Sequence, residues 1–138
     1  MKKYLSLLFV AIAVLCLTGC GNKPASLVCS KTSGSNKIIL TSNFVGNNLK
    51  SMGLAYDVDY SKYSDTFVTS VEKQDFCKKV SSLMYKYTLV DCKQKVENKH
   101  MIVTSGIDMS KFTKEETTGS PALTKEAMEK QGYTCELK

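Results

Sequence analysis

Residues 49–60 read LKSMGLAYDVDY, and this stretch decides the fold. Its larger apolar side chains fall on every second position and are separated by small or acidic residues. The apolar set is Met52, Leu54, Tyr56, Val58 and Tyr60. Because successive side chains of a β-strand point to opposite faces, this alternation predicts a strand with one buried face and one solvated face.

Two further strands are predicted before this one, over residues 27–32 and 37–45. The segments that separate the strands, residues 33–36 and 46–48, are rich in Gly, Asn and Ser. Gly and Asn accept the positive φ angles that tight turns require. The first three strands are therefore expected to form an antiparallel meander.

Residues 64–86 predict a helix, because their apolar side chains recur at helical spacing. The apolar stripe consists of Phe76, Val80, Leu83, Met84 and Tyr87. Thr69 and Glu72 fit the pattern of a capping box, so the regular part of the helix is expected to begin near residue 70.

Residues 88–97 and 101–109 predict a second hairpin, whose turn is Asn98–Lys99. On its first strand the residues expected to share one face are Val90, Cys92 and Val96.

The C-terminal part begins with a polar segment, residues 111–121, which predicts an exposed loop. A short helix is expected over residues 124–131, with Thr124 capping its start and Gly132 ending it in the left-handed conformation. Residues 133–137 predict a last short strand.

The expected order is thus β-β-β-α-β-β-α-β. Hairpins and meanders give antiparallel neighbours, so this order predicts an α+β fold with a largely antiparallel sheet and its helices packed on one face. Residues 27–138 are long enough for a single domain with a real hydrophobic core.

The N-terminus has the pattern of a secretory signal. Met1-Lys2-Lys3 is followed by an apolar stretch over residues 4–17 and then by small residues. About 14 apolar residues are too few to span a bilayer comfortably, which favours a cleaved signal over a permanent transmembrane helix.

The sequence Leu17-Thr18-Gly19-Cys20 resembles the lipobox of bacterial lipoproteins. The resemblance implies that signal peptidase recognises Leu17, Thr18 and Gly19, that residues 1–19 are removed, and that the thiol of Cys20 is diacylated. Residues 20–26 would then be a short lipidated tether. The alternative is an ordinary secretory signal in which Cys20 is structural.

Composition narrows the class of function. The 138-residue chain carries a net charge of +6, from scattered lysines without an arginine. It holds no Lys-rich block and no nucleic-acid-binding motif, so nucleic acid is not expected as a partner. A glycine-rich phosphate loop and a nucleophile elbow are also absent from the sequence.

Four cysteines follow Cys20, and an even number outside the cytoplasm predicts two disulfides. Cys77 lies about 13 Å from the end of its helix. Cys92 lies roughly 16 Å back along the next strand, at a similar height. This geometry favours Cys77–Cys92, which leaves Cys29–Cys135. The alternatives are a four-cysteine metal site, against which the absence of a C-x-x-C pair counts, and free buried thiols.

Few residues suggest catalysis. Asp57 and Asp59 share the solvated face of their strand and could act as acid and base or hold a cation. His100 follows a turn, and the sequence places no nucleophile or carboxylate beside it. Four tyrosines could line a cleft between sheet and helix, although core packing is the favoured explanation; they are Tyr56, Tyr60, Tyr85 and Tyr87. No catalytic residue, metal or cofactor is predicted.

Beyond the lipobox, the chain resembles the YehR-like family of small bacterial lipoproteins of unknown function. The resemblance rests on residues 107–112 (IDMSKF), on residues 123–128 (LTKEAM) and on Gly132-Tyr133. It implies an α+β domain without an established activity. The cysteines beyond Cys20 depart from this family, so the disulfides follow from this chain alone.

We therefore expect a monomer held by its lipid anchor on the extracytoplasmic face of the cell membrane. Its expected function is that of a non-catalytic module that binds a small ligand or an envelope protein. The alternatives are a surface enzyme that uses Asp57 and Asp59, and a purely structural lipoprotein.

Overall fold

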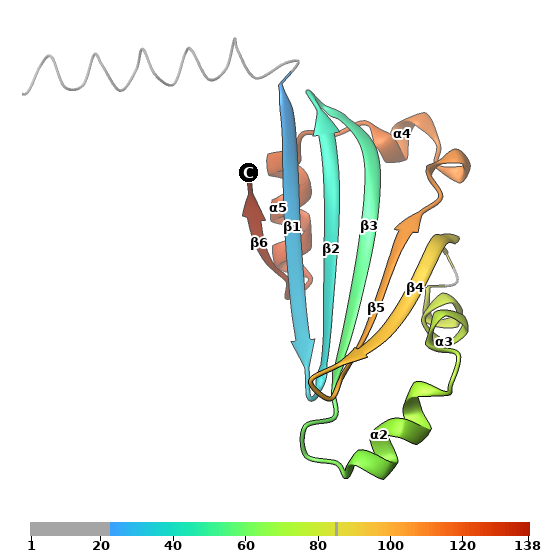
Figure 1. The fold of residues 1–138 in the computed structure, drawn as a ribbon. Coiled ribbons are helices and arrows are strands. Elements are labelled where there is room, and N and C mark those ends of the chain that lie inside the picture. The colour runs from blue at the N-terminus through green and yellow to red at the C-terminus, as the bar shows by residue number, and fades with distance from the viewer. Residues whose placement is uncertain (1–22, 85) are drawn as a thin grey trace, which may run out of the picture.

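A computed structural model describes residues 23–84 and 86–138 of the chain. These residues form one six-stranded antiparallel sheet with the order β4-β5-β3-β2-β1-β6 (Figure 1). The strands are β1 (Pro24–Ser33), β2 (Asn36–Val45), β3 (Asn48–Asp59), β4 (Leu89–Glu97), β5 (His100–Ile107) and β6 (Thr134–Leu137). The predicted α+β class and antiparallel sheet are confirmed.

Helical segments connect the strands and pack against the sheet. They are α2 (Asp65–Glu72), α3 (Phe76–Leu83), the 3-10 turn η1 (Met109–Lys111), α4 (Lys114–Thr117) and α5 (Pro121–Lys130). Figure 1 shows α5 beside β1 and β6 at one side of the sheet and α3 beside β4 at the other. No helix within the described ranges is long and apolar enough to cross a membrane.

Several expectations fall wholly or partly outside the described residues. They concern the signal peptide (1–19), the recognition residues Leu17, Thr18 and Gly19, the lipidation site Cys20, and Tyr85. Of the tether predicted over residues 20–26, the last three residues belong to β1, which begins at Pro24.

The alternation that predicted β3 is present in the structure. Leu54 and Val58 are buried, and Leu54 lies opposite Leu40 of β2 and Ser105 of β5. Residues opposite one another in an antiparallel sheet share a face, so these side chains lie on one face, which we call the helix face. The other face, with Asp57 and Asp59, is called the far face.

Two apolar clusters cover the helix face. The larger one joins α2 and α3 to β3 and β5, and consists of Leu54, Val58, Val71, Phe76, Val80, Met101 and Val103. The smaller one lies under α5 and consists of Leu27, Cys29 and Phe44, with Met128 and Tyr133 packed against it. The core is therefore divided into two parts, one at the β5 side of the sheet and one at the β1 side.

The single helix predicted over residues 64–86 is in fact two helices. Ser64 caps α2, and its side chain accepts a hydrogen bond from the backbone of Phe67. Asp75 caps α3 in the same way, through the backbone N–H of Lys78. Thr69 is not the predicted cap, because it lies inside α2 and donates its hydroxyl to the backbone oxygen of Asp65.

The prediction that Val90 shares a face with Cys92 and Val96 is wrong. The register of β4 shifts between Val90 and Lys93, and Asp91 has a φ of 53°. One extra residue in a strand moves the preceding side chains to the opposite face. Val90 therefore pairs with Gly106 and is exposed.

The polar segment 111–121 is not the plain loop that was predicted. Thr113 and Glu116 form a capping box at the start of α4, with reciprocal hydrogen bonds between side chains and backbone. The final helix also begins earlier than expected, because Ser120, rather than Thr124, is its cap. Gly132 follows it with a φ of 89°, in agreement with the predicted end.

Both disulfides pair as the sequence indicated. Cys29 and Cys135 lie directly opposite each other on β1 and β6, with their Cα atoms 4.1 Å apart. Cys77 on α3 bonds to Cys92 on β4. One disulfide therefore fastens the C-terminal strand to the sheet, and the other fastens α3.

Candidate binding cavity

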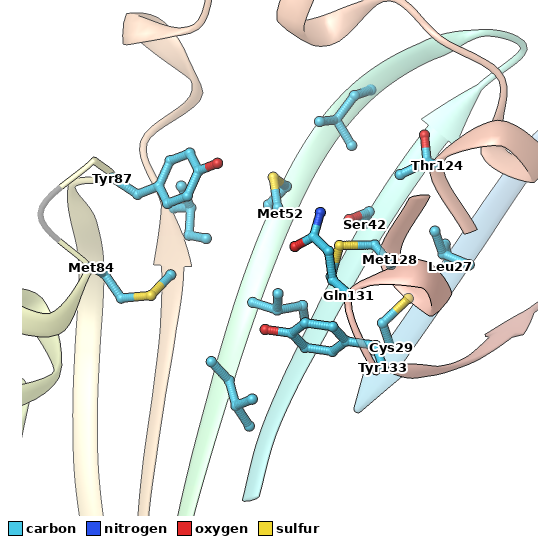
Figure 2. A pocket seen from close by; sticks show the side chains of 14 residues that line it. Leu27, Cys29, Ser42, Met52, Met84, Tyr87, Thr124, Met128, Gln131 and Tyr133 are labelled. Carbon is cyan, nitrogen blue, oxygen red and sulfur yellow. The ribbon is translucent and has the colours of Figure 1, made fainter. Parts of the chain in front are cut away.

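An apolar cavity lies on the helix face, between α5 and the segment that follows α3. Its volume is about 270 Å³, and its floor is formed by side chains of β1, β2, β3 and β5. In Figure 2, Met84 and Tyr87 stand on one side, Met128, Gln131 and Tyr133 stand on the other, and Met52 lies between them. We call this space the central cavity.

The central cavity has an uncharged lining. No Lys, Asp, Glu or His among the described residues contributes to it. Its polar side chains, apart from the two tyrosines, are Ser42, Thr124 and Gln131. An uncharged lining with a few polar groups suits an apolar ligand, because a charged group placed there would lose its water without gaining a partner.

Methionines from three separate elements line the central cavity: Met52 of β3, Met84 at the end of α3, and Met128 of α5. Methionine is unbranched and flexible, and its thioether is polarisable, so it adapts to ligands of varied shape. The lining therefore favours a flexible apolar ligand over one of fixed shape.

The two disulfides hold the two walls of this cavity. Met84 and Tyr87 lie within the 15-residue loop that Cys77–Cys92 closes. Tyr133 lies two residues before Cys135, which is bonded to Cys29 of the floor. The structure thus fixes both walls to one sheet by covalent bonds.

A smaller, polar space adjoins the central cavity, and we call it the polar cleft. It measures about 120 Å³ and is lined by Lys86, Tyr87, Thr88, Asp108, Lys111, Phe112 and Glu116. Tyr87 lines both spaces, and its ring stacks on Phe112 with the ring centroids 5.4 Å apart. The aromatic pair therefore stands where the apolar space meets the polar one.

Both carboxylates of the polar cleft are engaged by backbone N–H groups. Asp108 accepts a 2.9 Å hydrogen bond from the backbone N–H of Ser110, and the side chain of Ser110, followed by this backbone bond, is the main cause of a lowered pKa of its carboxyl group. Glu116 accepts one from Thr113, also at 2.9 Å, and this bond is the main reason that its pKa is lowered. Lys111 instead donates to a neutral group, the hydroxyl of Thr88, over 3.1 Å.

The predicted pair Asp57 and Asp59 is found on the far face together with His100. The Nδ1 atom of His100 lies 2.8 Å from Asp57 Oδ1, and its Nε2 atom lies 3.7 Å from Asp59 Oδ1. The hydrogen bond with Asp57 is the main cause of a raised pKa of His100. The expectation that His100 has no carboxylate beside it is therefore wrong.

The cluster on the far face can hold and orient a proton on His100. Asp59 is also occupied locally, because Ser61 donates to its carboxylate, and this contact is the main cause of its lowered pKa. None of these three residues lines the central cavity or the polar cleft. Among residues 23–84 and 86–138, no group of three or more His, Cys, Asp or Glu side chains could hold a metal ion.

Core packing, the favoured explanation of the four tyrosines, holds for two of them, and the alternative of a cleft lining fits a third. Tyr87 lines the central cavity, whereas Tyr56 and Tyr60 pack against the larger apolar cluster. The methionines were not singled out. The signal that could have found the site is the number of flexible apolar residues, Met84 and Met128 among them, in the helical segments at either side of the sheet.

Comparison with known proteins gives little guidance. No family model matches this chain, and no curated protein does. A solved structure, the NMR structure of a protein from Streptococcus pneumoniae TIGR4, is similar over 83% of this chain and 84% of that one, with 11% sequence identity and a TM-score of 0.49. At that level the likeness carries no argument about this chain.

Proposed function

We propose that this chain is a lipid-anchored, extracytoplasmic binding module, related to the YehR-like lipoproteins, and that its ligand site is the central cavity. The observation that carries the proposal is an apolar, uncharged space of about 270 Å³ between two walls fixed by disulfides. Ligand pockets in proteins are mostly apolar, with a few polar groups that orient the ligand. The ligand in this proposal is apolar where it enters the cavity.

Two properties support binding at this site over simple incomplete packing. The side chains of Ser42, Thr124 and Gln131 supply polar groups that could orient a ligand. The walls come from segments that are distant in the sequence, and a disulfide ties each segment to the sheet; Cys29 of one disulfide lies in the cavity floor. A pre-organised site loses less entropy when the ligand binds.

Photochemical labelling tests the proposal on the full chain. Isolated membranes that contain the protein are incubated with a long-chain alcohol carrying a diazirine and an alkyne, and are then irradiated. Peptide mapping should place cross-links on both walls, near Met84 and near Met128. Cross-links confined to other parts of the chain would refute the central cavity as the ligand site.

A matched pair of variants on β3 sharpens this test. Met52→Trp places a larger side chain in the cavity and should reduce the labelling of both walls. Ser51→Trp adds the same ring at the adjacent, exposed position on the far face and should leave the labelling unchanged. Equal labelling of the two variants would count against the proposal.

The anchor is tested separately, by the intact mass of the membrane-extracted chain. We expect a chain that begins at Cys20, carries a diacylglyceryl group and gains the mass of four hydrogens on reduction of its two disulfides. A Cys20→Ser variant should lose the acyl mass. If the variant kept both its membrane attachment and its size, the lipobox interpretation would be wrong.

The alternative of a surface enzyme gains one observation from the structure, which is the position of His100 between Asp57 and Asp59. A histidine oriented by a carboxylate is a common general base. These three residues, however, lie on the far face and do not line the central cavity, which is on the helix face. We therefore propose a non-catalytic module, in which these residues join β3 to β5.

A further inference from the structure

The arrangement of the two adjoining spaces narrows the class of ligand, on the condition that the proposed function is correct. The central cavity is uncharged, and the polar cleft beside it holds Lys86 and Lys111. Tyr87 lines both, so the two spaces share a wall, and a ligand that occupies both has to pass this ring. A ligand that matches both spaces has an apolar part and a polar part.

The polar cleft holds two lysines and two carboxylates, so its charges balance, and binding of a negative head group depends on Lys111. Asp108 and Glu116 already accept hydrogen bonds from the backbone N–H groups of Ser110 and Thr113. Lys111 donates to the uncharged hydroxyl of Thr88, and Lys86 lies 3.6 Å from Glu116 in an exposed ion pair. The charge of Lys111 is a minor cause of the lowered pKa of Asp108, but Lys111 forms no direct ion pair with a described residue, so an incoming anion could gain a charge-assisted hydrogen bond from it.

The size of the two spaces sets the shape of the ligand. At about 270 Å³ the central cavity is small for a lipid with two chains, because ligand pockets commonly range from roughly 300 to 1,000 Å³. Its flexible methionines accommodate a hydrocarbon chain in more than one conformation. The cleft, at about 120 Å³, has room for a compact head group.

We propose that the ligand is a single-chain amphiphile whose hydrocarbon chain fills the central cavity and whose anionic head binds Lys111 in the polar cleft. A carboxylate and a phosphate monoester both supply the required charge. Such molecules belong to membranes, which is where the proposed anchor would hold the protein.

Three photoactivatable probes with the same chain test this inference on the full-length protein in isolated membranes. They are a fatty acid, a lysophosphatidic acid and the neutral long-chain alcohol. We expect at least one of the two anionic probes, the fatty acid or the lysophosphatidic acid, to label the cavity walls more strongly than the alcohol. Lys111→Gln should lower the labelling by the anionic probe by roughly threefold, as expected for the loss of one exposed charge, and leave the alcohol unaffected.

Lys114→Gln is the matched control. Lys114 is an exposed lysine three residues further on that does not line the cleft, so its loss should change neither kind of labelling. If Lys111→Gln and Lys114→Gln behaved alike, or if the alcohol labelled the walls as strongly as the anions did, the anionic head would be refuted while the cavity remained a binding site. If no probe labelled the walls, the proposed function itself would fail.

Discussion

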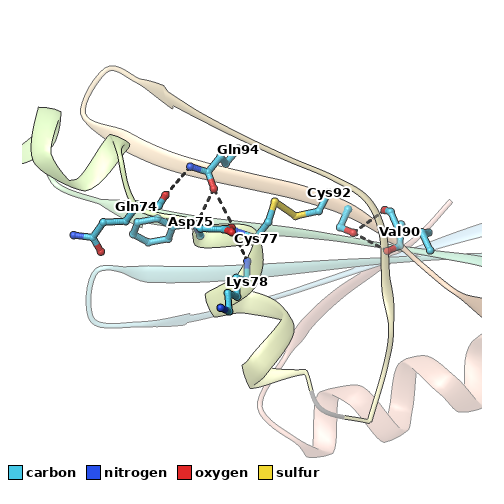
Figure 3. Close-up of a disulfide and its surroundings, with 10 residues drawn as sticks. Gln74, Asp75, Cys77, Lys78, Val90, Cys92 and Gln94 are labelled. Atoms are coloured by element: carbon cyan, nitrogen blue, oxygen red, sulfur yellow. Dashed lines mark hydrogen bonds between the residues drawn. A yellow bond between two sulfur atoms is a disulfide. The ribbon is translucent and has the colours of Figure 1, made fainter.

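The side-chain oxygen of Gln94 accepts a 2.8 Å hydrogen bond from the backbone N–H of Phe76, and so joins β4 to the first turn of α3 (Figure 3). The same oxygen accepts a longer bond from Cys77, and the amide nitrogen donates to the backbone oxygen of Gln74. The first N–H groups of a helix have no partner within the helix, and Gln94 supplies one from another element. It reinforces the disulfide between Cys77 and Cys92 at the same place.

Replacement of Gln94 by alanine should therefore destabilise the protein. The change removes the acceptor for two N–H groups of α3, and we expect a loss of about 1 to 2 kcal/mol in the free energy of unfolding, as for other helix caps. Urea denaturation of the oxidised protein measures it. Lys93→Ala is the control, because Lys93 is exposed on the far face of the same strand. A Gln94 variant as stable as this control would contradict the capping role.

The titration of His100 can be followed without ambiguity, because it is the single histidine of the chain. We expect its imidazole signals in NMR spectra to report a pKa above the ordinary value of 6.5. Asp57→Asn should lower that pKa, since the hydrogen bond with Asp57 is the largest cause of the shift. Asp59→Asn should lower it less. A larger effect at Asp59 would show that the 2.8 Å contact does not dominate in solution.

The raised pKa of His100 also predicts how stability depends on pH. A group whose pKa is higher in the folded protein binds its proton more tightly there, so it stabilises the fold below its unfolded pKa and loses this effect as pH rises through the folded value. The wild type should exceed His100→Gln in stability most clearly near pH 5.5 to 6, above the range near pH 4 where carboxylates take up protons. Thermal denaturation at several pH values measures the difference, which should shrink toward pH 8. A difference that grew with pH would contradict the ion pairs.

How much of this fold the sequence could predict depends on the range of the interaction involved. The alternation around Leu54 and the turn at Asn98–Lys99 are local features, and both appear in the structure; Asn98 and Lys99 have φ values of 50° and 63°. The bulge at Asp91 is also local, yet nothing in the alternation of β4 indicated it, and it moved Val90 to the far face. A period of two residues cannot reveal an inserted residue.

Other features depended on pairing between distant segments. His100 meets Asp57 and Asp59 because β5 pairs with β3, and the sequence predicted each hairpin without predicting that neighbourhood. The break between α2 and α3 is fixed partly by Gln94, which lies on a strand further along the chain. The central cavity is harder still to predict from the sequence, since it depends on the spacing between two helices on the same sheet. The capping box of Thr113 and Glu116, by contrast, rests on a local Thr-x-x-Glu pattern, yet the segment was predicted as a loop.

Removal of either disulfide should destabilise the protein, by amounts that differ with the length of the loop that each closes. The loop-entropy relation gives about 3 kcal/mol for Cys77–Cys92 and between about 4 and 5 kcal/mol for Cys29–Cys135, whose sequence separations are 15 and 106. Double alanine variants of each pair, compared by urea denaturation, measure these losses.

The two variants should also differ in the cavity wall that they loosen. Without Cys77–Cys92, cross-links of the alcohol probe near Met84 and Tyr87 should weaken more than those near Met128, because this disulfide closes the loop that carries Met84 and Tyr87. Without Cys29–Cys135, the cross-links near Met128 should weaken more, because this disulfide adjoins the opposite wall. If both variants kept the wild-type pattern of cross-links on the two walls, the disulfides would stabilise the fold without shaping the cavity, and the site would owe its form to the packing of α3 and α5 alone.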